Sequence, residues 1–221
     1  MIAVQNDFKS RAKEVIRYFK FLREFDAKRV AFNPATPNTS VMSAEEQTAL
    51  FKTLKANGFL LLYNLVESTL KNAIEAIFDE FKARGVSFDA CHDKVRNVVL
   101  TNVKKRNVDD LLPSLTSISI DIVVATFRKD ELFSGNVDGR RIRDVADSYG
   151  FRRPAKKSDN LLTVKTNRND LAHGNKSFAE VGRDYGMNEL KKIQIEVVAF
   201  LKELLANVAE YLSNRTYLSP I

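Results

Sequence analysis

The sequence contains few of the residues that interrupt helices or cross-link a chain. Its 221 residues include eight Gly, five Pro, one Cys and no Trp. A single cysteine, Cys91, cannot form an internal disulfide, and with only His92 beside it, it provides no metal cluster. Ala, Leu, Lys and Glu are plentiful and favour helix over sheet. We therefore expect a helical protein that needs neither disulfides nor a metal.

Long hydrophobic runs are also missing. The apolar run from Asn57 to Val66 is far too short to cross a bilayer. The N-terminal residues from Met1 to Phe8 contain no basic stretch followed by an apolar block, so we expect no export signal. Together with the lone cysteine, these absences predict a cytoplasmic protein with no membrane partner.

The composition is that of a folded protein with a basic surface. Hydrophobic residues make up 44% and charged residues 29%, which is typical of globular proteins. The length predicts one domain over residues 1–221, with residues 1–42 as an N-terminal helix and loop extension. The net charge of +7 favours an anionic partner, most commonly nucleic acid, although an ordinary basic surface would also account for it.

Apolar residues recur at steps of three and four, the pattern of amphipathic helices. Ser43 and Glu46 form a capping box before the second helix, whose middle is apolar on nearly every side. The residues from Phe32 to Ser40, with two prolines, predict a loop. We find no internal repeat, and the fold class is all-α. The predicted helices are Ile2 to about Val30, about Ala44 to Lys82, Phe88 to Lys105, Leu115 to Arg128, Asp138 to Tyr149, Asp159 to His173 and Met187 to Ser213.

The strongest candidate for chemistry is His173 at the end of a predicted helix. Gly174 follows it and suits the left-handed position beyond a helix end, so the imidazole should lie among free carbonyls. The negative end of the helix dipole favours the protonated ring, and a group that titrates near neutrality suits acid–base catalysis. His92, the other histidine, lies in an unremarkable stretch and is a weaker candidate.

Two polar residues precede His173 on the same helix. Asn169 is four residues away and shares its face, so its amide can orient the ring. Arg168 is five residues from His173, which places the two side chains about 140° apart around the helix. Only the long arginine side chain, a distorted helix end or a second copy could bring the guanidinium and the imidazole to one phosphate. The planar guanidinium of Arg168 stays charged and can bind two oxygens of a phosphate. Such residues near a helix end can also simply satisfy backbone carbonyls.

The segment Arg168-Asn169-Asp170-Leu171-Ala172-His173 resembles the HEPN superfamily signature of an Arg, a polar residue, three to five variable residues and a His. The stretch from Val164 to Phe178, with Phe133 to Gly139 before it, is similar to the MAE-like HEPN branch of bacterial conflict proteins. The resemblance covers roughly Leu60 to Leu212 and implies an HEPN-like helical bundle of four to five main helices plus short accessory helices.

The resemblance also implies a function. Members of the superfamily are typically metal-independent endoribonucleases of the toxin or phage-defence type, without a cofactor, and they leave a 2′,3′-cyclic phosphate. They form homodimers in which two motifs face each other across a cleft. By this resemblance RNA is the partner, His173 transfers protons, Arg168 stabilises the phosphate and Asn169 orients the imidazole.

Two further residues and a partner protein are also candidates. Asn64 and Glu67, one turn apart on the apolar helix, either support the motif or form a polar bridge between helices. An antitoxin or defence-system partner protein is also implied. Some HEPN toxins carry a Tyr two residues beyond the His, which a partner nucleotidyltransferase modifies. Asn175 occupies that position here, which argues against this form of neutralisation.

Two other classes of protein remain open. The stretch from Arg140 to Phe151 has the Ala, three residues, Gly spacing of a helix-turn-helix, which would indicate a DNA-binding regulator. A non-catalytic RNA- or partner-binding HEPN module is the second alternative. The basic residues around this stretch could instead form an RNA-phosphate track or an ordinary solvated face; they are Arg140, Arg141, Arg143, Arg152, Arg153, Lys156 and Lys157.

Overall fold

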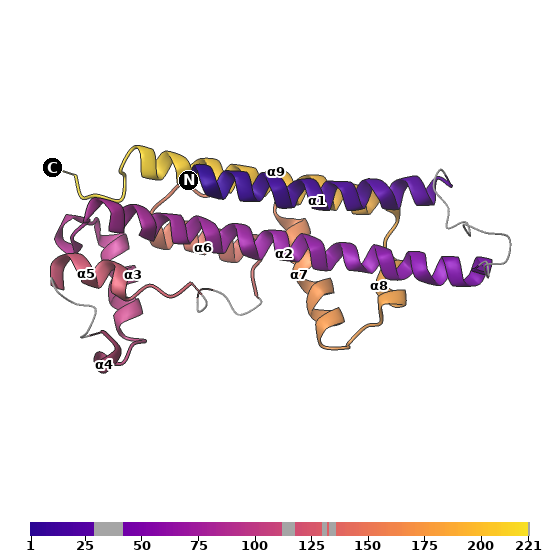
Figure 1. Cartoon of the computed structure of the whole chain (residues 1–221), viewed down its shortest axis with the longest axis horizontal. Coiled ribbons are helices and arrows are strands. Elements are labelled where there is room, and N and C mark those ends of the chain that lie inside the picture. The colour runs from indigo at the N-terminus through magenta and orange to yellow at the C-terminus, as the bar shows by residue number, and fades with distance from the viewer. Residues whose placement is uncertain (29–41, 112–117, 130–131, 133–135, 221) are drawn as a thin grey trace. The chain divides into compact units, whose positions relative to one another are not determined.

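The computed structural model describes residues 1–28, 42–111, 118–129, 132 and 136–220, and these residues form an all-α structure. Within them, the sole β-type pairing is an isolated bridge between Cys91 and Leu218. A 3-10 turn, η1, covers Phe88–Ala90. The α-helices, labelled in Figure 1, are α1 (Ile2–Asp26), α2 (Ala44–Arg84), α3 (Asp93–Val103), α4 (Val108–Leu111), α5 (Ile118–Ala125), α6 (Gly139–Tyr149), α7 (Asp159–Ala172), α8 (Phe178–Asp184) and α9 (Met187–Ser213).

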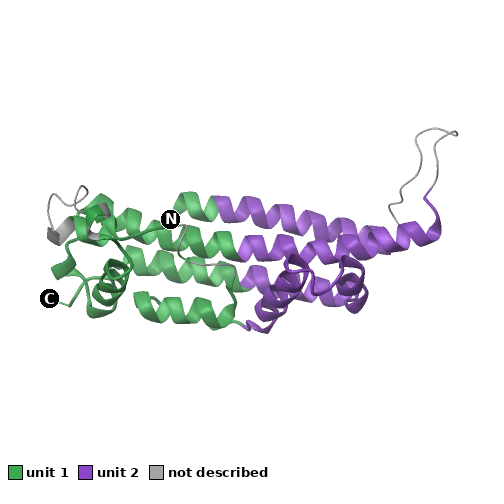
Figure 2. Cartoon of the chain, turned by 90° about the horizontal axis from the view of Figure 1, so that it is seen from below, with its two compact units in different colours: residues 1–6, 67–156, 200–221 green, residues 7–66, 157–199 purple. Residues whose placement is uncertain are grey.

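The chain divides into two compact units (Figure 2). Unit 1 contains residues 1–6, 67–156 and 200–221, and unit 2 contains residues 7–66 and 157–199. Each unit therefore combines segments that are far apart in the sequence. Unit 2 contains α7 with the Arg168 to His173 segment, and unit 1 contains α3 to α6.

The two ends of α2 follow from local sequence signals. The backbone N–H of Ser43 donates to the Glu46 carboxylate at 2.7 Å, and the N–H of Glu46 donates to the Ser43 hydroxyl at 3.2 Å. Hydrogen bonds from the backbone and side chain of Ser43 to the carboxylate hold the pKa of Glu46 below its usual value. At the other end Gly85 adopts a left-handed conformation with φ of 57°, which ends the helix after Arg84. The predicted capping box is confirmed.

In unit 2, α1 packs closely against the first half of α2. The Tyr18 hydroxyl donates to the carbonyl of Leu54 at 2.6 Å. The rings of Phe25 and Phe51 lie 5.2 Å apart. A Cβ added to Gly58 would lie 2.9 Å from the ring of Phe19, so the missing side chain lets the two helices approach.

Helix α8 lies against the same part of α2 and was not predicted from the sequence. The side chain of Ser177 caps α8 and Glu180 completes a capping box. Gly182 is buried against the backbone of Lys52, and a Cβ there would collide with the Lys52 carbonyl oxygen. The contact is therefore possible only for glycine.

The core of unit 1 is rich in aromatic rings. Phe78 stacks on Phe127 with centroids 4.1 Å apart, and Phe81 lies 5.0 Å from Tyr217. The Tyr211 hydroxyl donates to the carbonyl of Tyr149 at 2.6 Å, and burial raises the pKa of both tyrosines. Helices α3 and α6 pack against each other in this unit.

Several predicted boundaries were wrong. Helix α1 ends at Asp26, four residues before the predicted end. The predicted helix from Phe88 to Lys105 is instead the turn η1 followed by α3, because His92 begins a new helix there. The loop from Phe32 to Ser40 and residues 115–117 of the Leu115 to Arg128 helix lie outside the described residues. No described helix combines the length and apolarity needed to span a bilayer.

Substituting Gly182 tests the close contact between α8 and α2. Gly182→Ala should lower the free energy of unfolding by about 1–3 kcal/mol, because the new methyl group forces the backbones apart. Urea unfolding followed by circular dichroism measures the change. A stability equal to that of the unmodified protein would contradict the close packing.

Candidate functional site

The backbone after α7 is fixed by a Schellman motif that begins at the candidate histidine. His173 is the C-cap residue, and Gly174 follows it with φ of 69°. The N–H of Asn175 donates to the carbonyl of Asp170 at 2.8 Å, and the N–H of Gly174 donates to that of Leu171 at 3.4 Å. The predicted glycine at the helix end is confirmed, and the position of His173 in the last turn follows from it.

The imidazole of His173 is exposed at this helix end. The described residues place no hydrogen-bonding side chain against it, while its backbone N–H donates to the carbonyl of Asn169 at 2.9 Å. An exposed imidazole four residues from Asn169 shares a helical face with that residue. His173 is therefore accessible to a ligand.

Arg168 is held against α2 and not against His173. Its guanidinium carbon lies 4.5 Å from the centre of the Tyr63 ring, a cation–π distance, and its terminal nitrogen donates to the Asn169 side-chain oxygen at 3.0 Å. Tyr63 is itself only 3% exposed. A buried ring of the neighbouring helix thus restricts the rotamers of the motif arginine, and Asn169 contacts the arginine directly.

A buried hydrogen-bond pair supports α7 one residue before the motif. Asn167 is 4% exposed, and its amide donates to the carbonyl of Thr163 at 2.9 Å and to the Tyr185 hydroxyl at 2.8 Å. The carbonyl of Tyr185 accepts a hydrogen bond from Lys55 at 2.7 Å, and its ring lies 4.7 Å from that of Phe59. This chain of contacts joins α7, the end of α8 and α2 within unit 2. Sequence analysis did not identify Tyr63, Asn167 or Tyr185.

The two residues predicted to support the motif from α2 are not found together in a buried bridge. Asn64 is exposed, so it does not form a polar bridge in the core. Glu67 belongs to unit 1, and its carboxylate forms an ion pair with Lys71 at 2.7 Å. The interpretation of these two residues as a bridge between helices was wrong for Asn64, because Tyr63 and not Asn64 turns toward α7. Any role of either residue in supporting the motif stays a prediction.

Three of the basic residues predicted to contact RNA have partners within the chain. Arg143 donates to the carbonyls of Pro154 and Lys156, at 3.1 and 2.9 Å. Arg152 donates to Asn207 at 2.8 Å, and Arg153 pairs with Asp147. These contacts hold the loop after α6. Contact of the three arginines with RNA stays a prediction.

The other four basic residues are exposed. Arg140 and Arg141 lie in the first turn of α6, and Lys156 and Lys157 lie in the loop before α7. Residues 140–156 belong to unit 1, whereas Lys157 and the Arg168 to His173 segment belong to unit 2. An RNA track over these residues stays a prediction.

The helix-turn-helix interpretation does not agree with the structure. Gly150 does end α6, with φ of 83°, but residues 150–158 separate α6 from α7. A helix-turn-helix joins its helices by a turn of about three or four residues. The Ala146 to Gly150 spacing therefore reflects an ordinary helix end.

His92 and Cys91 have structural roles. The His92 Nδ1 accepts a hydrogen bond from the N–H of Val95 at 3.3 Å and so caps α3. Burial lowers the pKa of this imidazole, which keeps it neutral and able to accept. Burial raises the pKa of the Cys91 thiol to about 11, so the thiolate nucleophile is disfavoured.

One family model matches almost the whole chain. The family described as HEPN_MAE_28990-like HEPN matches residues 3–217. The chain belongs to this HEPN family. The match extends the predicted resemblance, which began near Leu60, to α1, and the observed helical bundle agrees with it. No curated protein and no solved structure matches the chain.

Two glycines allow a matched test of the helix end at His173. Gly174 and Gly85 both have positive φ, and neither has an atom within 4 Å of an added Cβ. Replacing either by Ala should therefore lower the free energy of unfolding through backbone strain alone, by about 1–2 kcal/mol. Only Gly174→Ala should also change the environment of His173.

Urea unfolding measures the change in the free energy of unfolding. NMR of the imidazole signals measures the change in the environment of His173, since the chain has only two histidines. The Gly85→Ala variant is the control for strain at a helix end in the other unit. Unchanged His173 signals in Gly174→Ala would show that the glycine does not fix the imidazole.

Proposed function

We propose that the protein is a metal-independent endoribonuclease whose active site combines the Arg168 to His173 segments of two copies. The observation that carries the proposal is the exposed imidazole of His173, on the same helix as a fixed arginine, in a chain that belongs to an HEPN family. An imidazole and a guanidinium are the groups that cleavage of RNA by its own 2′-hydroxyl requires.

The reaction needs a base, an acid and a cation. The base removes the proton of the 2′-hydroxyl, and the 2′-oxygen attacks the neighbouring phosphorus. The bond from phosphorus to the 5′-oxygen breaks, and the acid protonates this leaving oxygen. The products are a 2′,3′-cyclic phosphate and a 5′-hydroxyl. Arg168 stabilises the negative charge on the phosphate oxygens during the attack.

Two copies of the chain supply the two imidazoles that the base and the acid require. Each copy contributes one accessible imidazole, because His92 caps α3. Two His173 side chains across a twofold axis can act as the base and the acid. The 140° between Arg168 and His173 on an ideal helix also favours completion of the site by a second copy.

The dimer that we propose uses the face of α7 that carries the motif. Leu162 is 52% exposed on this helix, and it lies seven residues before Asn169. Seven residues are nearly two turns, so Leu162, Asn169 and His173 follow one stripe of the helix. Burying Leu162 against its counterpart in the second copy would bring two motifs together.

The membership of an HEPN family supports a role in conflict or defence. We propose that the enzyme is a toxin or phage-defence effector, and that a partner protein neutralises it. Asn175 lacks the phenolic oxygen that a nucleotidyltransferase would modify, so the partner would act by binding.

One observation favours a different function. The guanidinium of Arg168 already contacts Tyr63 and Asn169, so the motif could bind RNA or a partner protein without cleaving RNA. In that case the protein is a non-catalytic binding module. The two functions differ in whether cleavage occurs without a metal.

The role of His173 can be tested by replacing each histidine in turn. Purified protein should cleave RNA in EDTA and leave cyclic-phosphate ends. His173→Ala should slow cleavage by about a hundredfold or more, because proton transfer is lost. His92→Asn is the control, since Asn also caps helices.

Cleavage rates come from gels of labelled RNA. Cyclic-phosphate ends are identified because a phosphatase removes their phosphate only after acid has opened the ring. Analytical ultracentrifugation confirms that the variants keep the assembly of the unmodified protein. Undiminished cleavage by His173→Ala would contradict the proposed mechanism. RNA binding without cleavage by the unmodified protein would support the binding module.

The proposed dimer face can be tested with a charged residue. Leu162→Arg should give a monomer and abolish RNA cleavage, because like charges would meet across the twofold axis. Leu100→Arg is the matched control, since Leu100 is 46% exposed on α3. Sedimentation velocity gives the mass of each variant. A dimer that persists in Leu162→Arg would place the interface elsewhere.

A further inference from the structure

Helix α7 buries three aliphatic side chains and one amide. Its buried residues are Leu161, Val164, Asn167 and Leu171. Apolar contacts are not directional, so the three aliphatic side chains alone would tolerate a rotation of α7 about its own axis. Hydrogen bonds weaken steeply when the donor, its hydrogen and the acceptor depart from a line. Among the buried side chains of α7, the amide of Asn167 is therefore the one that can select a single rotation.

One of the two hydrogen bonds of Asn167 leaves the helix. The amide donates to the carbonyl of Thr163 at 2.9 Å, and this bond moves with α7 and does not resist its rotation. The amide also donates to the hydroxyl of Tyr185 at 2.8 Å, and this bond joins α7 to the residue at the end of α8. Asn167 is only 4% exposed, so a rotation that breaks the second bond leaves a buried donor short of a partner.

Tyr185 is itself fixed to α2. Its carbonyl accepts a hydrogen bond from the ammonium group of Lys55 at 2.7 Å, and its ring lies 4.7 Å from the ring of Phe59. The same ammonium group lies 5.6 Å from the centre of the Phe51 ring, which holds the lysine in place. These residues belong to unit 2, as does α7. The phenol hydroxyl is therefore a fixed reference point for the rotation of α7.

The rotation of α7 decides where the side chains of the motif lie. Each residue turns about 100° around a helix, so Arg168 lies about 100° from Asn167 and His173 lies about 240° from it. With the amide of Asn167 turned inward, the guanidinium of Arg168 meets the ring of Tyr63 at 4.5 Å, and His173 is exposed. A rotation in either direction moves the guanidinium away from the ring centre and changes the direction of the imidazole.

We propose that the hydrogen bond between Asn167 and Tyr185 sets the rotation of α7, which makes these two residues positioning residues for the motif from Arg168 to His173. A single buried polar residue that fixes the register of apolar helices is a well-attested device. The consequence for cleavage rests on the proposed ribonuclease function, because a displacement of about 1 Å can slow a reaction about a hundredfold. The rotation itself can be measured without RNA.

A pair of matched variants tests the effect on cleavage. Tyr185→Phe removes the hydroxyl and keeps the ring that lies against Phe59. It should lower kcat about tenfold with little change in KM, because the groups that bind RNA remain but the reacting groups are misdirected. Tyr18→Phe is the control, since it removes a hydroxyl that donates to the carbonyl of Leu54 at 2.6 Å in the same unit. An equal fall of kcat in both variants would overturn the proposal.

A double variant separates positioning from stability. Asn167→Leu combined with Tyr185→Phe replaces both partners of the hydrogen bond with apolar side chains, which is close to neutral for folding. Urea unfolding should show that the double variant regains the stability lost in Tyr185→Phe. Cleavage should stay about tenfold slow, because no directional bond sets the rotation. A kcat that recovers together with stability would show a merely structural role and overturn the proposal.

NMR of the full chain without RNA measures the rotation directly. The Nε–H signal of Arg168 is shifted by the ring of Tyr63, and the variant Arg168→Lys identifies this signal by its loss. The shift should be lost in Tyr185→Phe and in the double variant, and kept in Tyr18→Phe. A signal that is unchanged in Tyr185→Phe would overturn the proposal whether or not cleavage slows. If the unmodified protein does not cleave RNA, the proposed function fails, and the NMR result still decides the role of this hydrogen bond.

Discussion

The burial of α2 is the constraint on which the other contacts depend. Its middle is apolar on nearly every side, so several elements must cover it. In unit 2, α1 places Phe19 on Gly58, and α8 places Gly182 on the backbone of Lys52. In unit 1, Phe78 and Phe81 of α2 contact aromatic rings from later segments. Burial of each such ring stabilises the fold by roughly 1.5–3 kcal/mol.

The burial of α2 also positions the arginine of the candidate site. Tyr63 is buried in α2, and it forms the surface on which the guanidinium of Arg168 rests. The arginine is therefore positioned by core packing, whereas His173 is positioned by the backbone of the helix end. An arginine turned toward the core and a histidine exposed to solvent are not a complete site in one copy. This arrangement supports the proposal that a second copy completes it.

Much of the fold could be predicted from local signals in the sequence. The helix predicted from roughly Met187 to Ser213 agrees with α9, and Ser43 with Glu46 and Gly85 indicated the ends of α2. Ser177 and Glu180 form the same kind of capping box, so α8 could also have been found. The break at His92 was missed because an imidazole is an uncommon cap.

The site was less predictable than the fold because its contacts join distant segments. The spacing of Arg168, Asn169 and His173 indicated the helix end and the shared face of the last two residues. It did not reveal that Arg168 stacks on Tyr63, since that contact depends on how α7 packs on α2. Asn64 was chosen as the polar residue of a buried helix, but the ring of the preceding residue faces α7 instead.

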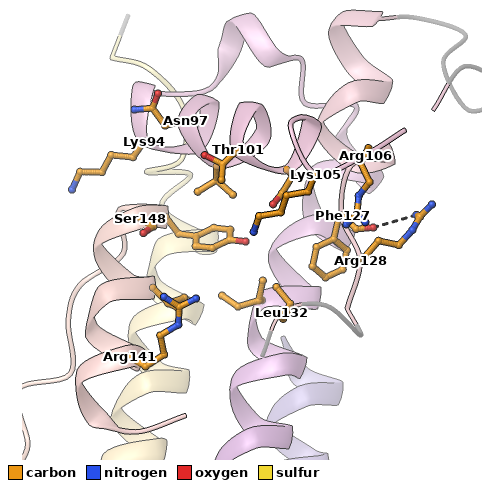
Figure 3. Close-up of a pocket in the computed structure, with 15 residues that line it drawn as sticks. Lys94, Asn97, Thr101, Lys105, Arg106, Phe127, Arg128, Leu132, Arg141 and Ser148 are labelled. Carbon is orange, nitrogen blue, oxygen red and sulfur yellow. Dashed lines mark hydrogen bonds between the residues drawn. The ribbon is translucent and has the colours of Figure 1, made fainter. Parts of the chain in front are cut away.

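The net positive charge of the chain becomes informative only when each cation is assigned to its partners. Arg143, Arg152 and Arg153 lie near one another in the sequence, and they contact backbone, amide and carboxylate groups of the chain. Lys105 and Arg141 are far apart in the sequence and suggested no motif together, yet they line one pocket of unit 1 (Figure 3). Clustering along the chain is therefore a poor guide to which cations lie together in this protein. The electrostatic potential at a point depends on which charges lie near it in space, so the fold and not the order of residues decides which cations act together.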